Sequence, residues 1–408
     1  MRQILLVIFF TALTHMHASK LKEGVYRGLL YLNEQQNVLL PFNFDISHRQ
    51  DKWHMVIHNA DEKIEVDEIT VLQDSVVIKL PVFDTEFRAK LVRDGLDGVW
   101  INHYRKEKNQ VKFKAVINDK SRFVTPTATQ HPHFEGKWAV TFSPGLPEAY
   151  SAIGLFHHTE QSTLVHGTFL TETGDYRYLE GSQIDNKLFL SCFDGSHAFL
   201  FVAEIDSSNQ LHGTFFSGSH WKENWIARKD DKFELKKADE ITSIVNPQAA
   251  LQFSFVNLEN KPVSLNDSKF QNKAVLVQIM GSWCPNCMDE SAMLAPLYEQ
   301  YKDQGLEIIA LAFEKTNDTA IAKKQLLRLQ KRFSIGYDIL ITGLSGKTKA
   351  SEIFPMLSDI SAFPTLIYLD KKHKIVSVHT GFSGPATGKA YAELKNQTES
   401  LIKQLIHQ

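Results

Sequence analysis

The sequence predicts an all-β N-terminal region followed by a C-terminal α/β domain. Before about residue 230, short runs of β-branched and aromatic residues recur between turn residues, a spacing typical of an all-β fold. Beyond about residue 248, apolar runs of strand length alternate with helical patterns. At roughly 150 residues per domain, 408 residues are enough for two or three domains with cores of their own.

The composition is that of an ordinary globular protein. The chain has 45 Lys and Arg residues against 47 Asp and Glu, a net charge of -2, with 43% hydrophobic and 23% charged residues. These values argue against extended disorder and against a polycationic nucleic-acid binder. We therefore expect no nucleic-acid partner.

Residues 1–18 are expected to be a secretory signal peptide. Arg2 precedes an apolar run from Ile4 to Leu13, and Ala18 offers a small residue for cleavage. As a helix the apolar run reaches only about 15 Å, half the hydrocarbon thickness of a bilayer, which disfavours a membrane anchor. We expect a soluble protein in the periplasm or in another extracytoplasmic compartment.

An internal repeat divides the all-β region into two similar units. Asp74–Ile78 resembles Asn186–Leu190, and Leu96–Trp100 resembles Leu211–Phe215. Two repeated β units, each a barrel or a sandwich, account for this pattern. Strands are predicted at Val38–Ile46, Trp53–Ile57, Ser75–Leu80, Leu188–Phe193 and Phe199–Ala203.

The boundaries of the β units follow from the segments between them. Pro126 and Pro132 are unsuited to a central strand, so the first unit is placed at 19–119 and the second at 134–230. The charged residues 231–247 show no apolar period and are expected to form a solvated linker.

The α/β domain is placed at residues 248–408. Ala274–Met280 is an apolar run interrupted only by Gln278, as expected of a central strand covered on both faces. Helices are predicted at 289–302, 318–332 and 388–406, and further strands at 307–313, 365–369 and 375–378, the last two as a hairpin.

Two of the three cysteines, Cys284 and Cys287, lie three residues apart at the start of a predicted helix. Unpaired N–H groups and the helix dipole stabilise a thiolate at that position, so Cys284 is the expected nucleophile. Cys287, one turn deeper, is placed to resolve a mixed disulfide.

Half of a zinc site is the alternative for a pair of cysteines at this spacing. Such a site needs two further ligands, but Cys192 lies far upstream and His373, His379 and His407 are not at ligand spacing. Cys192 itself alternates with apolar residues on a predicted strand, as a buried thiol does. We therefore expect no metal and no organic cofactor.

The segment Trp283-Cys284-Pro285-Asn286-Cys287 after a buried strand resembles a thioredoxin-fold active site, and Phe363-Pro364-Thr365 resembles that fold's cis-proline loop. From about Pro247 to Gln408 the chain is similar to the exported TlpA/ResA-like thiol-disulfide oxidoreductases. The hairpin-like segment Phe253–Leu265 and an insertion before Pro364 support this narrower resemblance.

The resemblance implies roles for individual residues. Glu290 matches the family's acid that moves protons at the dithiol. The alternative interpretation is that Glu290 is only a solvated acid on the surface of a helix. Trp283, Pro285, Phe363 and Pro364 would shape the surface that docks the substrate. Pro364 has the alternative of an ordinary strand-edge proline.

The resemblance also implies the reaction and the partners. The expected reaction is reduction of disulfides in exported proteins, apocytochromes among them, with a membrane thiol reductase as electron donor. Gln278 stands where thioredoxins bury an aspartate, and Asn286 stands where the family often has a proline. The dipeptide between the cysteines tunes the potential, so disulfide oxidation or isomerisation remains an alternative.

Thiol peroxidase and a binding module are two other classes of function for this chain. A thiol peroxidase needs Thr or Ser three residues before the attacking cysteine and Pro four before that, where this chain has Gly281 and Val277. A binding module in the β region with an ancillary redox domain is the alternative of a different class.

Overall fold

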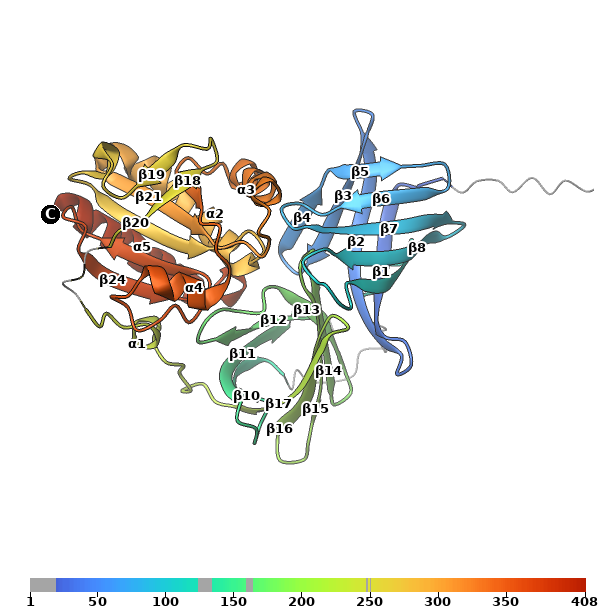
Figure 1. The fold of residues 1–408 in the computed structure, drawn as a ribbon. Coiled ribbons are helices and arrows are strands. Elements are labelled where there is room, and N and C mark those ends of the chain that lie inside the picture. Colours follow the sequence, from blue (N-terminus) through green and yellow to red (C-terminus); the bar gives the residue numbers. More distant parts are fainter. Residues whose placement is uncertain (1–19, 124–133, 159–163, 247–248, 250) are drawn as a thin grey trace, which may run out of the picture.

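The computed structural model describes residues 20–123, 134–158, 164–246, 249 and 251–408. It contains two β units and one α/β domain, which confirms the predicted fold class (Figure 1). The predicted signal peptide and the two prolines of the first join lie outside the described residues. No helix in the described part of the chain is long and apolar enough to cross a membrane.

The first β unit is an antiparallel sheet of nine strands in the order β4-β3-β2-β1-β9-β8-β7-β6-β5. Alternate side chains of the strands are buried, and the aromatic rings of Phe42, Phe87 and Phe113 meet in the interior. The strands are β1 (Gly24–Asn33), β2 (Val38–Arg49), β3 (Lys52–Asn59), β4 (Glu62–Val66), β5 (Glu68–Val71), β6 (Ser75–Lys79), β7 (Thr85–Val92), β8 (Gly95–Asn102) and β9 (Gln110–Ile117).

The second β unit is a closed antiparallel barrel of eight strands in sequence order, in which β10 pairs with β17. The repeated segments fall in corresponding strands, β6 with β14 and β8 with β16, counted back from the last strand of each unit. The strands are β10 (Gly136–Phe142), β11 (Tyr150–His158), β12 (Leu164–Thr171), β13 (Leu179–Ile184), β14 (Lys187–Phe193), β15 (Ala198–Ile205), β16 (Gln210–Ser217) and β17 (Trp221–Lys229).

The two β units are packed against each other through a shared interior. Phe193 of the barrel lies 4.6 Å from Phe42 of the first unit, measured between ring centroids. The buried guanidinium of Arg122 donates to Asn59 Oδ1 and Ser191 Oγ, each at 2.9 Å, and so joins the two units. Burial of these groups favours a fixed arrangement of the units.

The α/β domain is built on a seven-stranded sheet in the order β19-β18-β22-β21-β20-β23-β24. Helices α2, α3 and α5 cover one face, and α4 with the segments before β18 and after β19 covers the other. The strands are β18 (Ser254–Asn257), β19 (Pro262–Ser264), β20 (Ala274–Met280), β21 (Leu306–Ala312), β22 (Asp338–Ile341), β23 (Thr365–Leu369) and β24 (Ile375–Thr380). The helices are α2 (Pro285–Tyr301), α3 (Thr319–Phe333), α4 (Gly346–Ile353) and α5 (Lys389–His407).

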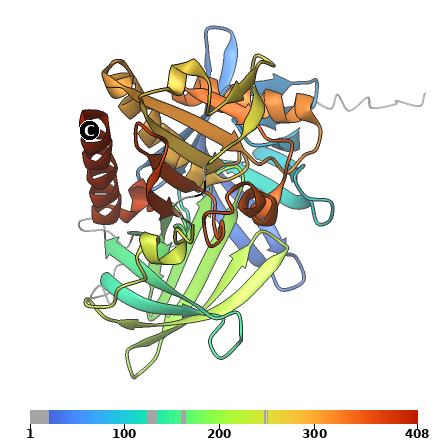
Figure 2. The ribbon, with the colours of Figure 1, turned by 60° about the vertical axis from the view of Figure 1, so that its left-hand side comes forward.

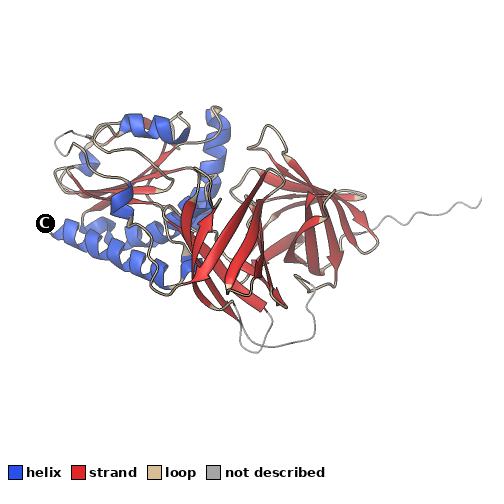
Figure 3. Cartoon of the chain, turned by 90° about the horizontal axis from the view of Figure 1, so that it is seen from below, coloured by secondary structure: helices blue, strands red, loops and turns tan. Residues whose placement is uncertain are grey.

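The α/β domain differs from the two β units in its secondary structure, and the three parts are in contact. Figure 3 shows helices in the C-terminal part and strands alone in the two β units. Figure 2 shows α5, which leads to the C-terminus, at the outer side of the molecule. Within the segment expected as a linker, the short helix α1 (Ala238–Ile241) is followed by Thr242, which is buried and hydrogen-bonded to Thr380 at 2.7 Å. These later residues therefore pack on the α/β domain.

Candidate active site

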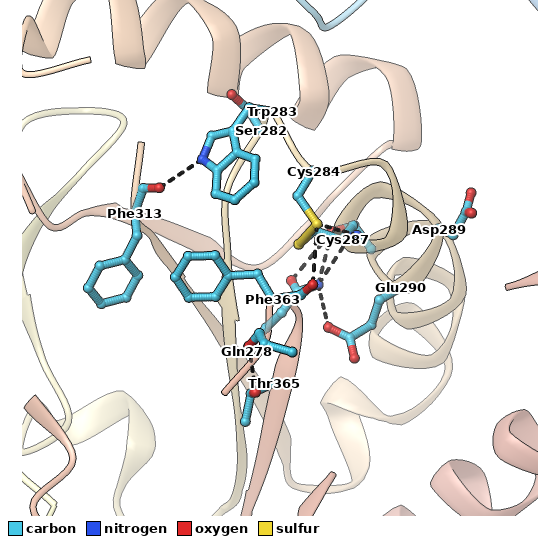
Figure 4. The surroundings of a disulfide bond; sticks show 12 residues. Gln278, Ser282, Trp283, Cys284, Cys287, Asp289, Glu290, Phe313, Phe363 and Thr365 are labelled. Atoms are coloured by element: carbon cyan, nitrogen blue, oxygen red, sulfur yellow. Dashed lines mark hydrogen bonds between the residues drawn. A yellow bond between two sulfur atoms is a disulfide. The ribbon is translucent and has the colours of Figure 1, made fainter. Parts of the chain in front are cut away.

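The site is centred on a disulfide between Cys284 and Cys287 at the start of α2 (Figure 4). Strand β20 delivers the chain to this point, Cys284 caps the helix, and Pro285 occupies its first turn, where a missing N–H costs nothing. Cys284 Sγ accepts a hydrogen bond from Cys287 N at 3.2 Å. Cys287 is fully buried and Cys284 is 6% exposed, so only Cys284 offers a surface for attack.

Trp283 lies beside the disulfide and is held from two sides. Its Nε1 donates to the carbonyl oxygen of Phe313 at 2.9 Å, and its ring meets that of Phe363 edge-on at 5.7 Å. A Cβ at Gly281 would lie 2.3 Å from the indole nitrogen, so this position needs glycine. Trp283 and Phe363 are both half-buried and form one aromatic wall beside the sulfurs.

The loop before β23 approaches the disulfide from the other side. The Phe363–Pro364 peptide bond is cis, and the carbonyl oxygen of Phe363 lies 3.5 Å from Cys284 Sγ. Pro364 is buried beneath this loop, and Pro285 is also buried although it lines the cavity next to the sulfurs. The structure thus brings all four residues expected to dock a substrate close to the cysteines.

Glu290 is buried in the second turn of α2, with 1% of its surface exposed. Burial raises the pKa of its carboxyl group to about 8, and a hydrogen bond from Gln278 Nε2 at 2.9 Å opposes the shift. Ser291 Oγ, which lies 3.1 Å from Gln278 Nε2, donates to the carbonyl oxygen of Cys287 at 2.8 Å. A carboxyl group that titrates near neutral pH therefore lies in the same hydrogen-bond network as the second cysteine.

Two members of this site were not assigned from the sequence. Gln278 was noted only as a departure from thioredoxins, although a single amide in an apolar strand calls for a buried partner. Glu314, two residues after the end of β21, accepts hydrogen bonds from Ser282 N at 2.8 Å and Ser282 Oγ at 2.7 Å and thereby fixes the turn before Cys284. Burial raises the pKa of Glu314.

The barrel covers the site with the loop between β12 and β13. Asp175 Oδ2 accepts a hydrogen bond from Gly384 N at 2.6 Å. A Cβ at Gly174 would lie 2.1 Å from the side-chain nitrogen of Asn286, between the two cysteines. The redox centre is therefore enclosed by a β unit as well as by its own domain.

Arg177, on the same loop, joins all three parts of the chain. Its buried guanidinium pairs with Glu62 of the first β unit, with Asp194 of the barrel at 3.5 Å and with Asp289 of α2 at 2.5 Å. Burial raises the pKa of Asp289 to about 7, and the charge of Arg177 opposes the shift. No local sequence pattern connects these residues, and none was assigned to the site beforehand.

A cavity of about 660 Å³ opens between the barrel and the disulfide. Its lining includes Cys284, Trp283, Phe363, Arg105, Lys315 and the barrel loop at residues 171–177. The described residues contain no group of three or more His, Cys, Asp or Glu side chains placed to hold a metal ion. Cys192 is fully buried in β14, and burial raises the pKa of its thiol well above the ordinary value.

Comparisons with known proteins identify relatives of part of the chain. A family described as Redoxin matches residues 244–394. ResA, a thiol-disulfide oxidoreductase of Bacillus thuringiensis, is 27% identical over 177 residues, which are 43% of this chain and 82% of ResA. ResA from a Bacillus cereus strain is 32% identical over 127 residues, which are 31% of this chain and 65% of that protein.

Solved structures give likenesses over a similar share of the chain. A thiol:disulfide interchange protein of the thioredoxin family from Chlorobium tepidum is 18% identical, with a TM-score of 0.31, covering 40% of this chain and 99% of that one. A thiol-disulfide oxidoreductase from Bacteroides fragilis is 20% identical, with a TM-score of 0.28, covering 36% of this chain and 99% of that one.

Proposed function

We propose that the chain is a thiol-disulfide oxidoreductase that acts through its C-terminal domain. That domain is a ResA/TlpA-like Redoxin domain, as the sequence predicted. Cys284 and Cys287 are its reactive pair, and the chain reduces disulfides of other molecules outside the cytoplasm. The observation that carries the proposal is the position of this disulfide, which caps α2, faces the Phe363–Pro364 loop and lies one turn from a buried acid.

The first half of the reaction is nucleophilic attack by Cys284. In the reduced protein, the N–H of Cys287 and the start of α2 stabilise the Cys284 thiolate. The thiolate attacks one sulfur of a substrate disulfide, which forms a mixed disulfide and releases the other substrate sulfur as a thiolate. Cys284 is the more exposed sulfur, in keeping with this role.

The second half needs a proton acceptor at Cys287. The thiolate of Cys287 attacks Cys284 Sγ, restores the protein disulfide and releases the second substrate thiolate, so that two electrons pass to the substrate. Glu290 takes the proton from Cys287, because its pKa of about 8 lets it exchange a proton near neutral pH. Gln278 holds the carboxyl group in place through its hydrogen bond.

Substrate docking falls to the loop around the cis peptide bond. The carbonyl oxygen of Phe363 beside Cys284 offers an acceptor to an extended segment of the substrate, in the manner of strand addition. Trp283 and Phe363 supply an apolar wall, and the buried Pro285 and Pro364 fix the two loops.

The compartment and the partners rest on the signal peptide expected at residues 1–18 and on likeness to ResA. We place the chain in the periplasm or another extracytoplasmic compartment, with exported proteins, apocytochromes among them, as substrates. A membrane thiol reductase would return the Cys284–Cys287 pair to its dithiol form.

The equilibrium potential of the pair tests both the site and the direction. The full chain is titrated in defined dithiol buffers, and the free thiols are counted by alkylation. A two-electron transition near about -270 mV, the value of thioredoxin, supports a reductase, and one near about -120 mV, the value of DsbA, would reverse the direction to disulfide formation.

Single-cysteine variants locate the transition. Cys284→Ser and Cys287→Ser should each abolish it, and Cys287→Ser should accumulate a mixed disulfide on Cys284. The matched control is Cys192→Ala, which removes the buried third thiol and should leave the potential unchanged. A transition that survives Cys284→Ser would refute the assignment of the pair.

A further inference from the structure

The cavity beside the disulfide is built by all three parts of the chain. The α/β domain contributes Cys284 and Lys315, the first β unit contributes Arg105 from the loop after β8, and the barrel contributes residues 171–177. A barrel loop that merely tethered the redox domain would not need to line its reactive sulfur. The N-terminal region therefore forms part of the cavity through which a substrate reaches Cys284.

The size of the cavity favours a small ligand. A volume of about 660 Å³ lies within the range of small-molecule sites, which extends from roughly 300 to 1,000 Å³. Cys284 is only 6% exposed beneath the covering barrel loop, so a compact disulfide or a narrow extended segment reaches its sulfur more readily than a broad protein surface. A compact disulfide of a few tens of atoms fits both observations.

Two cations give the cavity its chemical preference. Neither the guanidinium of Arg105 nor the ammonium of Lys315 makes a hydrogen bond or ion pair within the described part of the chain. Lys315 Nζ lies 4.2 Å from the centre of the Trp283 ring, which places its charge directly beside the reactive turn. Desolvation lowers the pKa of both groups, and the charge of Arg105 lowers that of Lys315 further.

Among the described residues, no acid in or near the cavity forms an ion pair with Arg105 or Lys315. Asp175 is occupied by the backbone N–H groups of Gly384 and Arg177, at 2.6 and 2.7 Å. Glu314 acts electrostatically on Lys315 but is bound to Ser282. Glu172 also lines the cavity. An anion between Arg105 and Lys315 would relieve their repulsion at a site where solvent screening is reduced.

We propose that this cavity binds small disulfides that carry a carboxylate, with Arg105 and Lys315 holding the carboxylate while the disulfide meets Cys284. The inference rests on the proposed function and names its substrate class. The reaction is the exchange already described: the dithiol is oxidised, and one substrate disulfide is reduced to two thiols.

Three small disulfides that differ in charge test this assignment. The full chain is reduced, freed of reductant and mixed with 3,3′-dithiodipropionate (anionic), bis(2-hydroxyethyl) disulfide (neutral) or cystamine (cationic), and the second-order rate of thiol loss is followed. The expected order is anionic, then neutral, then cationic, with about a tenfold gap between the first two, corresponding to one charge-assisted hydrogen bond.

Variants assign the preference to the two cations. Arg105→Gln and Lys315→Gln should each lower the ratio of anionic to neutral rate about threefold, as two cations that share the tenfold preference, and Arg105→Lys should retain most of it. The matched control is Lys372→Gln, an exposed cation in the turn between β23 and β24, at the end of β23 away from Pro364. Lys372→Gln should leave the ratio unchanged.

The outcomes separate the two proposals. If the reduced chain reacts with all three disulfides at rates within twofold of one another, or if the variants lower all three rates equally, the substrate class is wrong and the redox function stands. If the chain reacts with none of them although the Cys284–Cys287 pair shows its two-electron transition, the substrate class is wrong and the redox function stands; if that transition is also absent, the proposed function fails and the substrate class falls with it.

Discussion

Asp289 and Glu290 are neighbours in α2, yet their carboxyl groups enter different surroundings. Figure 4 shows Glu290 directed toward Gln278 beneath the sulfurs and Asp289 directed away from them. Burial raises the pKa of both, to about 7 for Asp289 and about 8 for Glu290. Asp289 meets the guanidinium of Arg177, whereas the described partner of Glu290 is the neutral amide of Gln278.

The difference shows how one helical turn serves two purposes. An acid that faces a buried cation holds two domains together, and an acid that faces an amide in an apolar interior keeps its proton near neutral pH. The barrel side of α2 is thus built for attachment, and the interior side is built for proton transfer.

The largest expected effect comes from breaking the attachment. Arg177→Met leaves the carboxylates of Glu62, Asp194 and Asp289 buried without their cation, which typically costs about 3–5 kcal/mol. We expect a clear fall in the thermal unfolding midpoint and a wider separation of the domains in small-angle X-ray scattering. The exposed Arg93→Gln is the control, and equal midpoints for both variants would contradict the attachment role.

The second prediction concerns stability and pH on the interior side. The pKa of Glu290 is raised from 4.5 to about 8 on folding, so between these values the unfolded chain has released a proton that the folded chain keeps. Stability should therefore fall as pH rises through this interval, by on the order of a few kcal/mol for this group.

Glu290→Gln stays neutral at every pH and should flatten that slope. Denaturant unfolding of both proteins between pH 6 and 9 measures the difference. The exposed Glu352→Gln serves as the matched control and should retain the wild-type slope. An unchanged slope in Glu290→Gln would show that the carboxyl group titrates near its ordinary value.

The third prediction concerns the rate of disulfide exchange. Without the carboxylate, Cys287 loses its proton acceptor, so Glu290→Gln should slow the resolving step about 100-fold at pH 8. The wild-type rate should rise through pH 8 as the carboxylate forms, and the variant should lack this ionisation. Glu299→Gln, an exposed acid of the same helix, should change the rate by less than about threefold.

Some of the strands, most helices and the position of the Cys284–Cys287 pair at the start of a helix could be predicted because their signals are local. The short run of β-branched and aromatic residues at Trp53–Ile57 and the cysteine spacing after β20 need no knowledge of distant residues. By contrast, Gln278 meets Glu290 only because β20 and α2 pack together. Strand β22 and helix α4 were missed within the insertion after Phe313, since their short segments of four and eight residues carry weak periodic signals.

The covering of the site by the barrel could not be predicted from the sequence. Arg177 and Asp289 are separated by 112 residues, and their pairing depends on how two separately folded units dock. The repeat showed that two similar β units exist, but a repeat says nothing about which loop reaches the third domain. Polar residues in loops are common, and only their burial distinguishes Arg177 from its solvated counterparts.

The smallest effect is expected at a second link between the same parts of the molecule. Arg328 of α3 makes two hydrogen bonds of 2.8 Å to the carboxylate of Glu68 in β5, and the side chain of Glu68 is 52% exposed. Solvent screens an exposed pair, so Arg328→Gln should cost less than about 1 kcal/mol, and 0.5 M salt should remove most of the difference from wild type. Thermal unfolding at low and high salt, beside Arg177→Met, measures both links on one scale. If Arg328→Gln destabilised the chain as much as Arg177→Met, burial would not explain the difference in strength between the two links.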